Sequence, residues 1–161
     1  MKIPQFDSSV SFDSPVGNIN VYARGERVVF LNMGEAPCEA AGRAKVLGVA
    51  KKQLADYFKG KSKVLDFAVE LNGTKFQEAV WQQIVALGWG QTASYADIAK
   101  AIGNPKAVRA VGGAVGANPV PLVIGCHRVM GASGQITGYS GGDGIPTKKW
   151  LLAHESIDYR D

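Results

Sequence analysis

Alternation of hydrophobic and polar residues in the first third of the chain predicts β-strands. Val10 and Phe12 alternate with polar neighbours, and the turn-forming segment Asp13–Gly17 follows them. The runs Asn18–Ala23 and Arg27–Met33 are rich in apolar residues and are separated by a short turn that contains glycine. Short runs bounded by turn residues are typical of strands, so we expect strands at these places.

Apolar residues then recur at helical spacing over Ala36–Phe58, and Gly60 ends the predicted helix. Lys63–Leu71 returns to alternation, which predicts one more strand before the turn at Asn72-Gly73. Cys38 falls near the start of the helix with no base or cluster of charges beside it, so we interpret it as structural or incidental. This part of the chain predicts a small α/β domain without a cluster of reactive side chains.

The second half of the chain carries helix signals instead. Thr74–Gln77 has the pattern of a capping box, and the apolar spacing after it predicts a helix that ends at Gly88. Ser94 is placed to cap a helix over Tyr95–Ile102. A last helix is expected over residues 146–154.

A further helix is predicted over Lys106–Gly116, with Asn104 as its N-cap and Pro105 in its first turn. Together with the helix before it, this segment is a candidate helix-turn-helix. Helix pairs occur in many α-helical domains, so the pattern by itself says little about function.

One side of the predicted Lys106–Gly116 helix is almost bare of side chains. The small residues that leave it so are Ala107, Ala110, Gly112, Gly113, Ala114 and Gly116. Glycine costs a helix about 1 kcal/mol relative to alanine, so another interaction must offset these positions. Close packing against a second helix is one explanation. Close approach to a DNA minor groove is the other, and there Arg109 is the one long side chain that projects from the bare ridge.

The richest candidate chemistry lies where an apolar run ends in Gly125-Cys126-His127-Arg128. A cysteine beside histidine and arginine is in an electropositive setting that favours a thiolate. A thiol of pKa about 8.5 is roughly 3% ionised at pH 7, so full ionisation gains only about thirtyfold, and larger acceleration needs a pocket that positions the electrophile. Adjacent strand residues point to opposite faces, so either the chain turns at Gly125 or a water joins Cys126 to His127. A buried cysteine followed by surface charges is the alternative.

A glycine-rich loop, Gly131–Gly142, follows the cysteine segment. Its backbone groups could hold a planar ligand with Tyr139 as a wall, or the loop could be flexible and bind nothing. It lacks the spacings GxGxxG and GxxxxGK[ST], so we expect no nucleotide cofactor. Glu155, beside His154 near the end of the last helix, is a candidate carboxylate for this chemistry, but the sequence alone does not pair it with a histidine.

Composition narrows the setting of this chemistry. The chain has 161 residues, a formal net charge of +4, two cysteines and two histidines. We therefore expect neither a disulfide framework nor a zinc site built from Cys and His, and no apolar run is long enough for a membrane span. Residues 91–150 carry six Lys and Arg against two Asp, which is compatible with a polyanionic partner. A cytosolic or nuclear protein with reduced thiols fits best.

Six short motifs together make the chain resemble the O6-alkylguanine-DNA alkyltransferases, also called methylated-DNA–protein-cysteine methyltransferases. They are Ser94-Tyr95, Asn104–Gly113, Asn118–Pro121, Cys126–Val129, Gly138–Gly142 and Trp150–Glu155, and they follow the family's order and spacing. Residues 1–73 match only in general plan. The resemblance implies an α/β N-terminal domain of ribonuclease H-like fold over residues 1–73. It also implies a mainly α C-terminal domain with a winged helix-turn-helix over residues 74–161.

The resemblance also implies a reaction. A damaged guanine is flipped out of duplex DNA bound through its minor groove, and Cys126 takes the methyl or other alkyl group from its O6 atom. The same chemistry would serve O4 of thymine. Each molecule acts once, because the thioether does not turn over. The implied partner is double-stranded DNA containing O6-alkylguanine, and no cofactor, metal or membrane is involved. We expect a monomer in the cytoplasm, or in the nucleus of a eukaryote.

The same resemblance assigns roles to individual residues. His127 relays a proton through water, and Glu155 polarises His127. Asn118 ties the helix-turn-helix to the cysteine segment, Tyr95 donates toward the base, and Arg109 fills the place that the base leaves. The residues that would contact the DNA or the guanine are Arg109, Ala110, Gly112, Arg128, Val129, Tyr139 and Ser140.

Gly125 departs from the family pattern, which has proline before the cysteine. Proline fixes φ at about −65° and glycine does not, so the approach to Cys126 should be less preorganised. If that flexibility limits the reaction, Gly125→Pro should raise the transfer rate. Other functions stay open: a non-catalytic protein that recognises alkyl lesions, a cysteine hydrolase using Cys126 and His127, and a winged-helix regulator with an inert cysteine.

Overall fold

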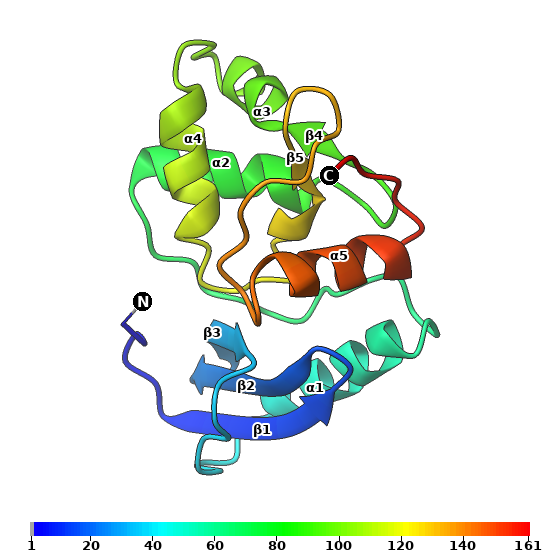
Figure 1. The fold of residues 1–161 in the computed structure, drawn as a ribbon. Coiled ribbons are helices and arrows are strands. Elements are labelled where there is room, and N and C mark those ends of the chain that lie inside the picture. Colours follow the sequence, from blue (N-terminus) through cyan, green and yellow to red (C-terminus); the bar gives the residue numbers. More distant parts are fainter. Residues whose placement is uncertain (1) are drawn as a thin grey trace. The chain divides into compact units, whose positions relative to one another are not determined.

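The computed structural model describes residues 2–161, which divide into two compact units (Figure 1). The first unit runs to Leu71 and includes Pro119–Pro121. The second consists of Asn72–Asn118 and Leu122–Asp161. The chain thus returns briefly to the first unit before it reaches the cysteine segment.

The first unit is built on an antiparallel sheet of strand order β1-β2-β3. The strands are β1 (Ser8–Ser14), β2 (Gly17–Arg24) and β3 (Arg27–Met33), which confirms the strands expected from the alternation. The helix α1 (Lys45–Phe58) packs on this sheet through buried residues that include Leu47, Ala50 and Leu54. The backbone N–H of Leu31 in β3 also donates to the carbonyl oxygen of Pro119 at 3.0 Å.

The helix predicted over Ala36–Phe58 is wrong in its first part, because α1 begins only at Lys45. Ala41 instead forms an isolated antiparallel bridge with Ser9, through backbone hydrogen bonds of 2.9 and 3.1 Å. The side chain of Asn20 holds the same segment by accepting from the backbone N–H of Cys38 at 3.0 Å. Cys38 therefore lies in an irregular segment and not at a helix start.

The strand predicted over Lys63–Leu71 is also wrong, since the segment forms only an isolated parallel bridge between Val28 and Val69. Phe67 is nevertheless buried while its neighbours Asp66 and Ala68 are not, as the alternation of apolar and polar residues predicts. The side-chain oxygen of Gln53 in α1 accepts from the backbone N–H groups of Asp66 and Phe67. These bonds take donors that a strand ladder would otherwise use.

Helices dominate the second unit, and Figure 1 shows α2, α3 and α4 gathered at one end of it. They are α2 (Lys75–Val85), α3 (Tyr95–Ala101), α4 (Val108–Gly116) and α5 (Ile145–His154). A short parallel pair joins β4 (Ala93–Ser94) to β5 (Val129–Met130). The buried indole N–H of Trp81 in α2 donates to the carbonyl oxygen of Ala114 in α4 at 2.9 Å, which fixes one helix against the other.

The caps predicted at Thr74 and Ser94 are confirmed, whereas the cap predicted at Asn104 is wrong, because Ala107 is the N-cap of α4. Thr74 forms a capping box with Gln77, and Ser94 forms one with Asp97. However, α4 begins at Val108 and not at Lys106, because the N–H of Ala107 donates to Asn104 O at 3.0 Å and closes a turn first. No helix within residues 2–161 is long and apolar enough to cross a membrane.

Candidate active site

The chain turns sharply at the cysteine. Gly125 has φ −70° and ψ 63°, and the N–H of Cys126 donates to the carbonyl oxygen of Ile124 at 2.7 Å. This geometry is an inverse γ-turn. A short 3₁₀-helix, η1 (Cys126–Arg128), follows it, so Cys126 and His127 do not alternate as they would in a strand. The turn at Gly125 considered in the sequence analysis is thus observed.

The Cys126 side chain borders a pocket of about 370 Å³. Contributions come from α3, α4, η1 and the glycine-rich loop before α5. The lining residues are Tyr95, Gly112, Val115, Gly116, Cys126, Gly138, Tyr139 and Ser140. Aromatic side chains and bare backbone leave room for a flat ligand beside the sulfur.

The bare face of α4 is not explained by packing within this chain. A Cβ atom added at Gly112, Gly113 or Gly116 would meet nothing within 4 Å among the described residues. Close packing against a second helix of this chain therefore does not explain these three glycines, although Ala114 on the same helix is buried and bonded to Trp81 of α2. Arg109 and Ala110 lie exposed on the same helix. These features leave the face free for a ligand from outside the chain.

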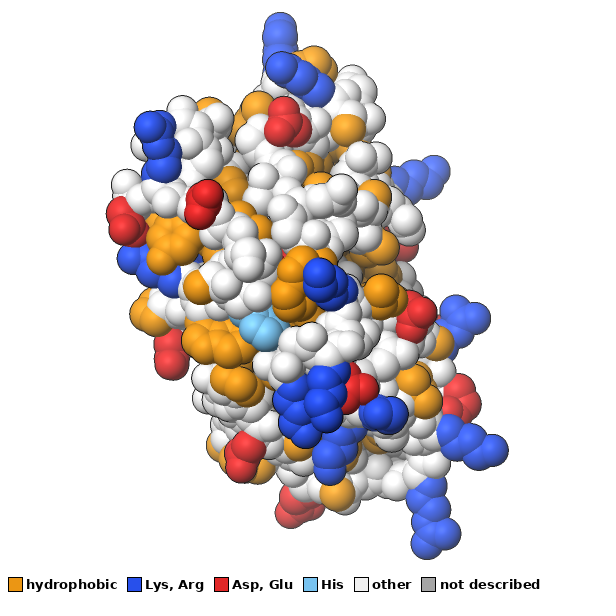
Figure 2. All heavy atoms as spheres, turned by 90° about the vertical axis from the view of Figure 1, so that its right-hand side faces the viewer, with side chains coloured by type: hydrophobic (Ala, Val, Ile, Leu, Met, Phe, Trp, Pro, Cys, Tyr) orange, Lys and Arg blue, Asp and Glu red, His pale blue; other side chains and the backbone are white. Residues whose placement is uncertain are grey.

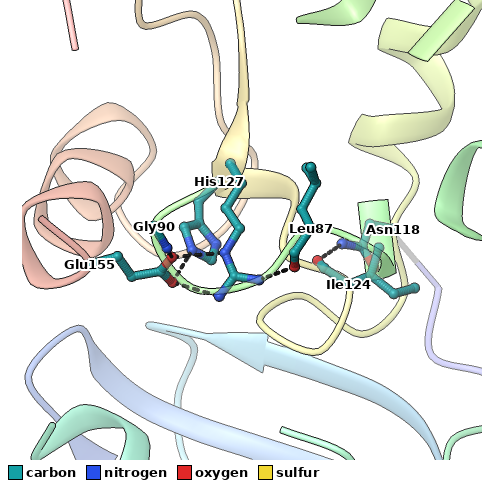
Figure 3. A network of polar contacts seen from close by, with 7 residues as sticks. Leu87, Gly90, Asn118, Ile124, His127 and Glu155 are labelled. Carbon is teal, nitrogen blue, oxygen red and sulfur yellow. Dashed lines mark hydrogen bonds and ion pairs between the residues drawn. The ribbon is translucent and has the colours of Figure 1, made fainter. Parts of the chain in front are cut away.

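Asn118 follows α4 and connects it with the segment before the cysteine. Its side-chain N–H donates to the carbonyl oxygen of Ile124 at 2.7 Å, and the residue is buried (Figure 3). Ile124 is the first residue of the inverse γ-turn. Asn118 thus holds the turn that presents Cys126.

A buried charge network is formed around His127, the residue that follows the cysteine in the chain (Figure 3). Nε2 of His127 is 2.6 Å from Oε2 of Glu155, and neither side chain is exposed. Arg128 donates to both carboxylate oxygens, from Nε at 2.8 Å and from Nη2 at 2.9 Å. Arg128 also donates from Nη1 to Leu87 O at 2.7 Å, and Gly90 N donates to Oε1 at 3.2 Å. The expected pairing of His127 with Glu155 is present.

This network sets the form of the histidine. Because Nε2 of His127 donates to Glu155, Nδ1 is left as the acceptor, and it has no hydrogen-bond partner among the described residues. Burial lowers the pKa of His127, against the opposing effect of Glu155, and the charges of Arg128 and Lys148 lower it further. A neutral imidazole with a free acceptor nitrogen is suited to take a proton.

The cysteine itself is a buried thiol. Burial raises the pKa of Cys126, while hydrogen bonds from Asn118 and Tyr139 and the charge of Lys148 oppose that rise. The thiolate setting expected from the flanking sequence is therefore not the resting state, because Arg128 directs its charge at Glu155. The thiol needs a base when it reacts.

Lys148 was missed by the sequence analysis. It lies in α5, is fully buried and donates from Nζ to the carbonyl oxygen of Val129 at 2.8 Å. Burial lowers the pKa of Lys148 to about 8, against an opposing effect of Cys126. Its spacing three and four residues before Leu151 and Leu152, which are both buried, was the signal that it faces inward.

The second histidine belongs elsewhere. His154 stacks on Trp150 at 4.7 Å between ring centroids and meets the edge of Trp89 at 5.0 Å. Figure 2 shows a histidine side chain at the surface among hydrophobic ones, and His127 is fully buried. Neither histidine lines the pocket, but His127 is the one that follows Cys126 in the chain and pairs with Glu155.

Some of the residues expected to contact the DNA or the guanine line the pocket, and others do not. Tyr95, Tyr139 and Ser140 line the pocket, and the hydroxyl of Tyr95 lies 2.8 Å from that of Thr137. Arg128 and Val129 are buried away from its lining.

Comparison with known proteins gives consistent matches. Residues 75–157 match the family model described as 6-O-methylguanine DNA methyltransferase, DNA binding domain. A methylated-DNA–protein-cysteine methyltransferase of Methanosarcina acetivorans is 38% identical over 150 residues, which cover 89% of this chain and 95% of the relative. A protein of that name from Salmonella typhimurium is 47% identical over 109 residues, which cover 67% of this chain and 63% of the relative.

Solved structures agree with these matches. The O6-methylguanine methyltransferase of Mycobacterium tuberculosis superposes with a TM-score of 0.82 and 38% identity, over 96% of each chain. The same organism's OGT in complex with DNA gives a TM-score of 0.81 at 38% identity over 92% of each chain. The α/β fold expected from the sequence is thus the fold of these proteins.

Proposed function

The chain belongs to the 6-O-methylguanine DNA methyltransferase family, and from that premise we propose that Cys126 is the residue that accepts the alkyl group. Its function is DNA repair by alkyl transfer to a protein cysteine, with the activity of a methylated-DNA–protein-cysteine methyltransferase. The observation that carries the proposal is the Cys126 thiol at the pocket, followed directly in the chain by His127, which pairs with Glu155. A non-catalytic lesion binder is not favoured.

The proposed reaction is a single displacement at the alkyl carbon. The Cys126 sulfur forms a bond to this carbon while the bond between the carbon and guanine O6 breaks, and the guanine leaves with the bonding electron pair. The thiol proton passes through a water to Nδ1 of His127, and one proton reaches the departing base, so that His127 ends neutral. Tyr95 donates toward the base from the pocket wall. The thioether is stable, and each molecule acts once.

DNA is the proposed ligand of the bare α4 face. The helices α3 and α4 form the helix-turn-helix, with the chain between η1 and α5 as its wing. Gly112, Gly113 and Gly116 leave open space above the helix, which suits the narrow minor groove. Arg109 projects from this face and fills the stack when the guanine is flipped out. Ala110 approaches the DNA backbone beside it.

The remaining proposed contacts surround the flipped base. Tyr139 forms a wall of the pocket, and the backbone of Ser140 binds the guanine edge, whereas the carbonyl oxygen of Val129 accepts from Lys148 outside the pocket lining. Specificity for O6-alkylguanine follows from this arrangement, with O4-alkylthymine as a second substrate. The first 73 residues form the ribonuclease H-like domain and residues 74–161 the transfer domain. The protein acts as a monomer in the cytoplasm, without cofactor.

Mass spectrometry after incubation with a duplex containing one O6-methylguanine tests the proposal. The tryptic peptide Ala110–Arg128 contains Cys126 and no other cysteine, so one added methyl group there is unambiguous. We expect methylation up to one group per chain in the protein and in Cys38→Ser, and none in Cys126→Ser. An unmodified peptide in a protein that binds the duplex would leave lesion recognition as the function.

A further inference from the structure

We propose that Arg128 is a positioning residue for the alkyl transfer: it holds Glu155 by a two-pronged ion pair, keeps His127 neutral, and occupies space that Gly125 leaves free. The inference rests on the proposed function, since it assigns a role within that same site. It also replaces the DNA contact expected of Arg128 from the sequence.

The guanidinium of Arg128 is fixed at three nitrogen atoms. Nε and Nη2 reach the two oxygens of Glu155 at 2.8 and 2.9 Å, and Nη1 reaches the carbonyl oxygen of Leu87 at 2.7 Å. A planar guanidinium that meets a carboxylate with two parallel bonds sets its orientation as well as its charge. Arg128 is only 6% exposed, so it has little surface to offer DNA in this arrangement.

Charge balance explains what Arg128 does for His127. Without Arg128, the buried carboxylate of Glu155 would lose the cation that balances its charge. His127, which contacts Glu155, could then supply a positive charge in its place, so a protonated imidazole would be favoured. A protonated His127 has no acceptor nitrogen and is not a base. The groups that face His127 are Glu155, which raises its pKa, and Arg128 and Lys148, which lower it.

Gly125 provides the clearance for this side chain. A Cβ atom at Gly125 would lie 3.0 Å from Nη1, 3.2 Å from Cδ and 3.3 Å from Cζ of Arg128. A long side chain normally yields to such a contact. This one is held by Leu87 and Glu155 on its other sides, so a shift at Nη1 must disturb those bonds.

Titration of the histidines in Arg128→Met tests the inference without using activity. The chain has only two histidines, so two-dimensional NMR of the imidazoles separates His127 from the surface residue His154. We expect the pKa of His127 to rise by about one unit or more in Arg128→Met and to return toward the wild-type value in Arg128→Lys, which keeps the charge. An unchanged His127 titration would overturn the inference.

Single-turnover methyl transfer, measured from pH 5.5 to 9 on the same variants, gives the second readout. We expect the rate of Arg128→Met at pH 7 to fall about tenfold and the acid limb of its profile to move to higher pH, while duplex affinity stays within about twofold of wild type. Weaker duplex binding with an unchanged rate at saturating DNA would assign Arg128 to DNA contact instead. Wild-type transfer to Cys126 in the same assay tests the proposed function separately.

Gly125→Ala is a second test for the case in which Arg128→Met does not fold. It keeps the guanidinium of Arg128 and all its partners, and adds only a methyl group beside it. We expect a severalfold slower transfer than in Gly48→Ala, whose added methyl group on α1 meets nothing within 4 Å. Equal rates in the two alanine variants would contradict the clearance assigned to Gly125.

Discussion

Nζ of Lys148 donates to the carbonyl oxygen of Val129 at 2.8 Å, which places a fully buried ammonium group directly behind the active-site turn. Among residues 2–161 no carboxylate forms an ion pair with Lys148; instead, Cys126 is the group that favours its charged form. Such a lysine is expected to cost stability and to support the thiolate that forms during transfer.

Lys148→Met should change how stability depends on pH. The pKa of Lys148 is about 8 in the folded chain and 10.5 when unperturbed. Between these values the unfolded chain binds the proton more strongly, so the free energy of unfolding of the wild type should rise with pH, by on the order of 3 kcal/mol in total. Urea unfolding at several pH values from 7 to 10.5 should show this rise reduced in Lys148→Met and retained in Lys149→Met. A parallel dependence in all three proteins would refute the prediction.

Asn118→Ala should weaken both the fold and the reaction. The variant loses the buried hydrogen bond to Ile124 O and the hydrogen bond that favours the Cys126 thiolate. Leaving a buried acceptor unsatisfied costs about 1–3 kcal/mol, so the urea midpoint should fall and transfer should slow. Asn104→Ala, at an exposed position, is the control. Wild-type behaviour of Asn118→Ala in both measurements would exclude the role assigned to Asn118.

Gly125→Pro is expected to slow the transfer, which reverses the expectation from sequence. The φ of Gly125 is already −70°, so proline has little to organise. Its Cβ atom would instead press on Arg128, as described above. A severalfold slower single-turnover rate is the predicted result, and a faster rate would show that flexibility before Cys126 limits the wild type.

Substitutions of Gly113 should separate helix stability from DNA binding. Gly113→Ala should stabilise α4 by roughly 0.5–1 kcal/mol, because alanine is the better helix former and the added Cβ atom meets nothing within 4 Å. Gly113→Leu should also fold but should bind duplex DNA at least severalfold more weakly, since it blocks the bare face. Thermal unfolding and fluorescence anisotropy measure the two effects. Undiminished DNA binding by Gly113→Leu would place the DNA elsewhere.

Local signals predicted two helix caps and the three strands of the first unit. Thr74 and Ser94 each lie three residues before a side chain that completes a capping box, so the sequence contains all the participating groups. The start of α4 was misplaced by a local turn between Asn104 and Ala107, and the failures in the first unit involve partners farther away in sequence. The start of α1 was misplaced because Ser9, more than thirty positions from Ala41, pairs with the segment before it.

The site shows the same division. Cys126 and His127 stand out in the sequence because a cysteine beside histidine and arginine is a candidate nucleophile. Arg128 was assigned to DNA contact from the family resemblance. Only the fold brings Glu155 and Leu87 to its guanidinium from positions 27 and 41 residues away.

The bond from Leu31 to Pro119 has a consequence for how the protein is made. The first unit includes Pro119–Pro121, which leave the ribosome almost fifty residues after Leu71. During synthesis, the N–H of Leu31 in β3 can bond to Pro119 only after α2, α3 and α4 have emerged. A gene fragment that ends at Leu71 would therefore encode the first unit without the segment that bonds to β3. A circularly permuted or split version should be designed so that Pro119–Pro121 still reaches β3.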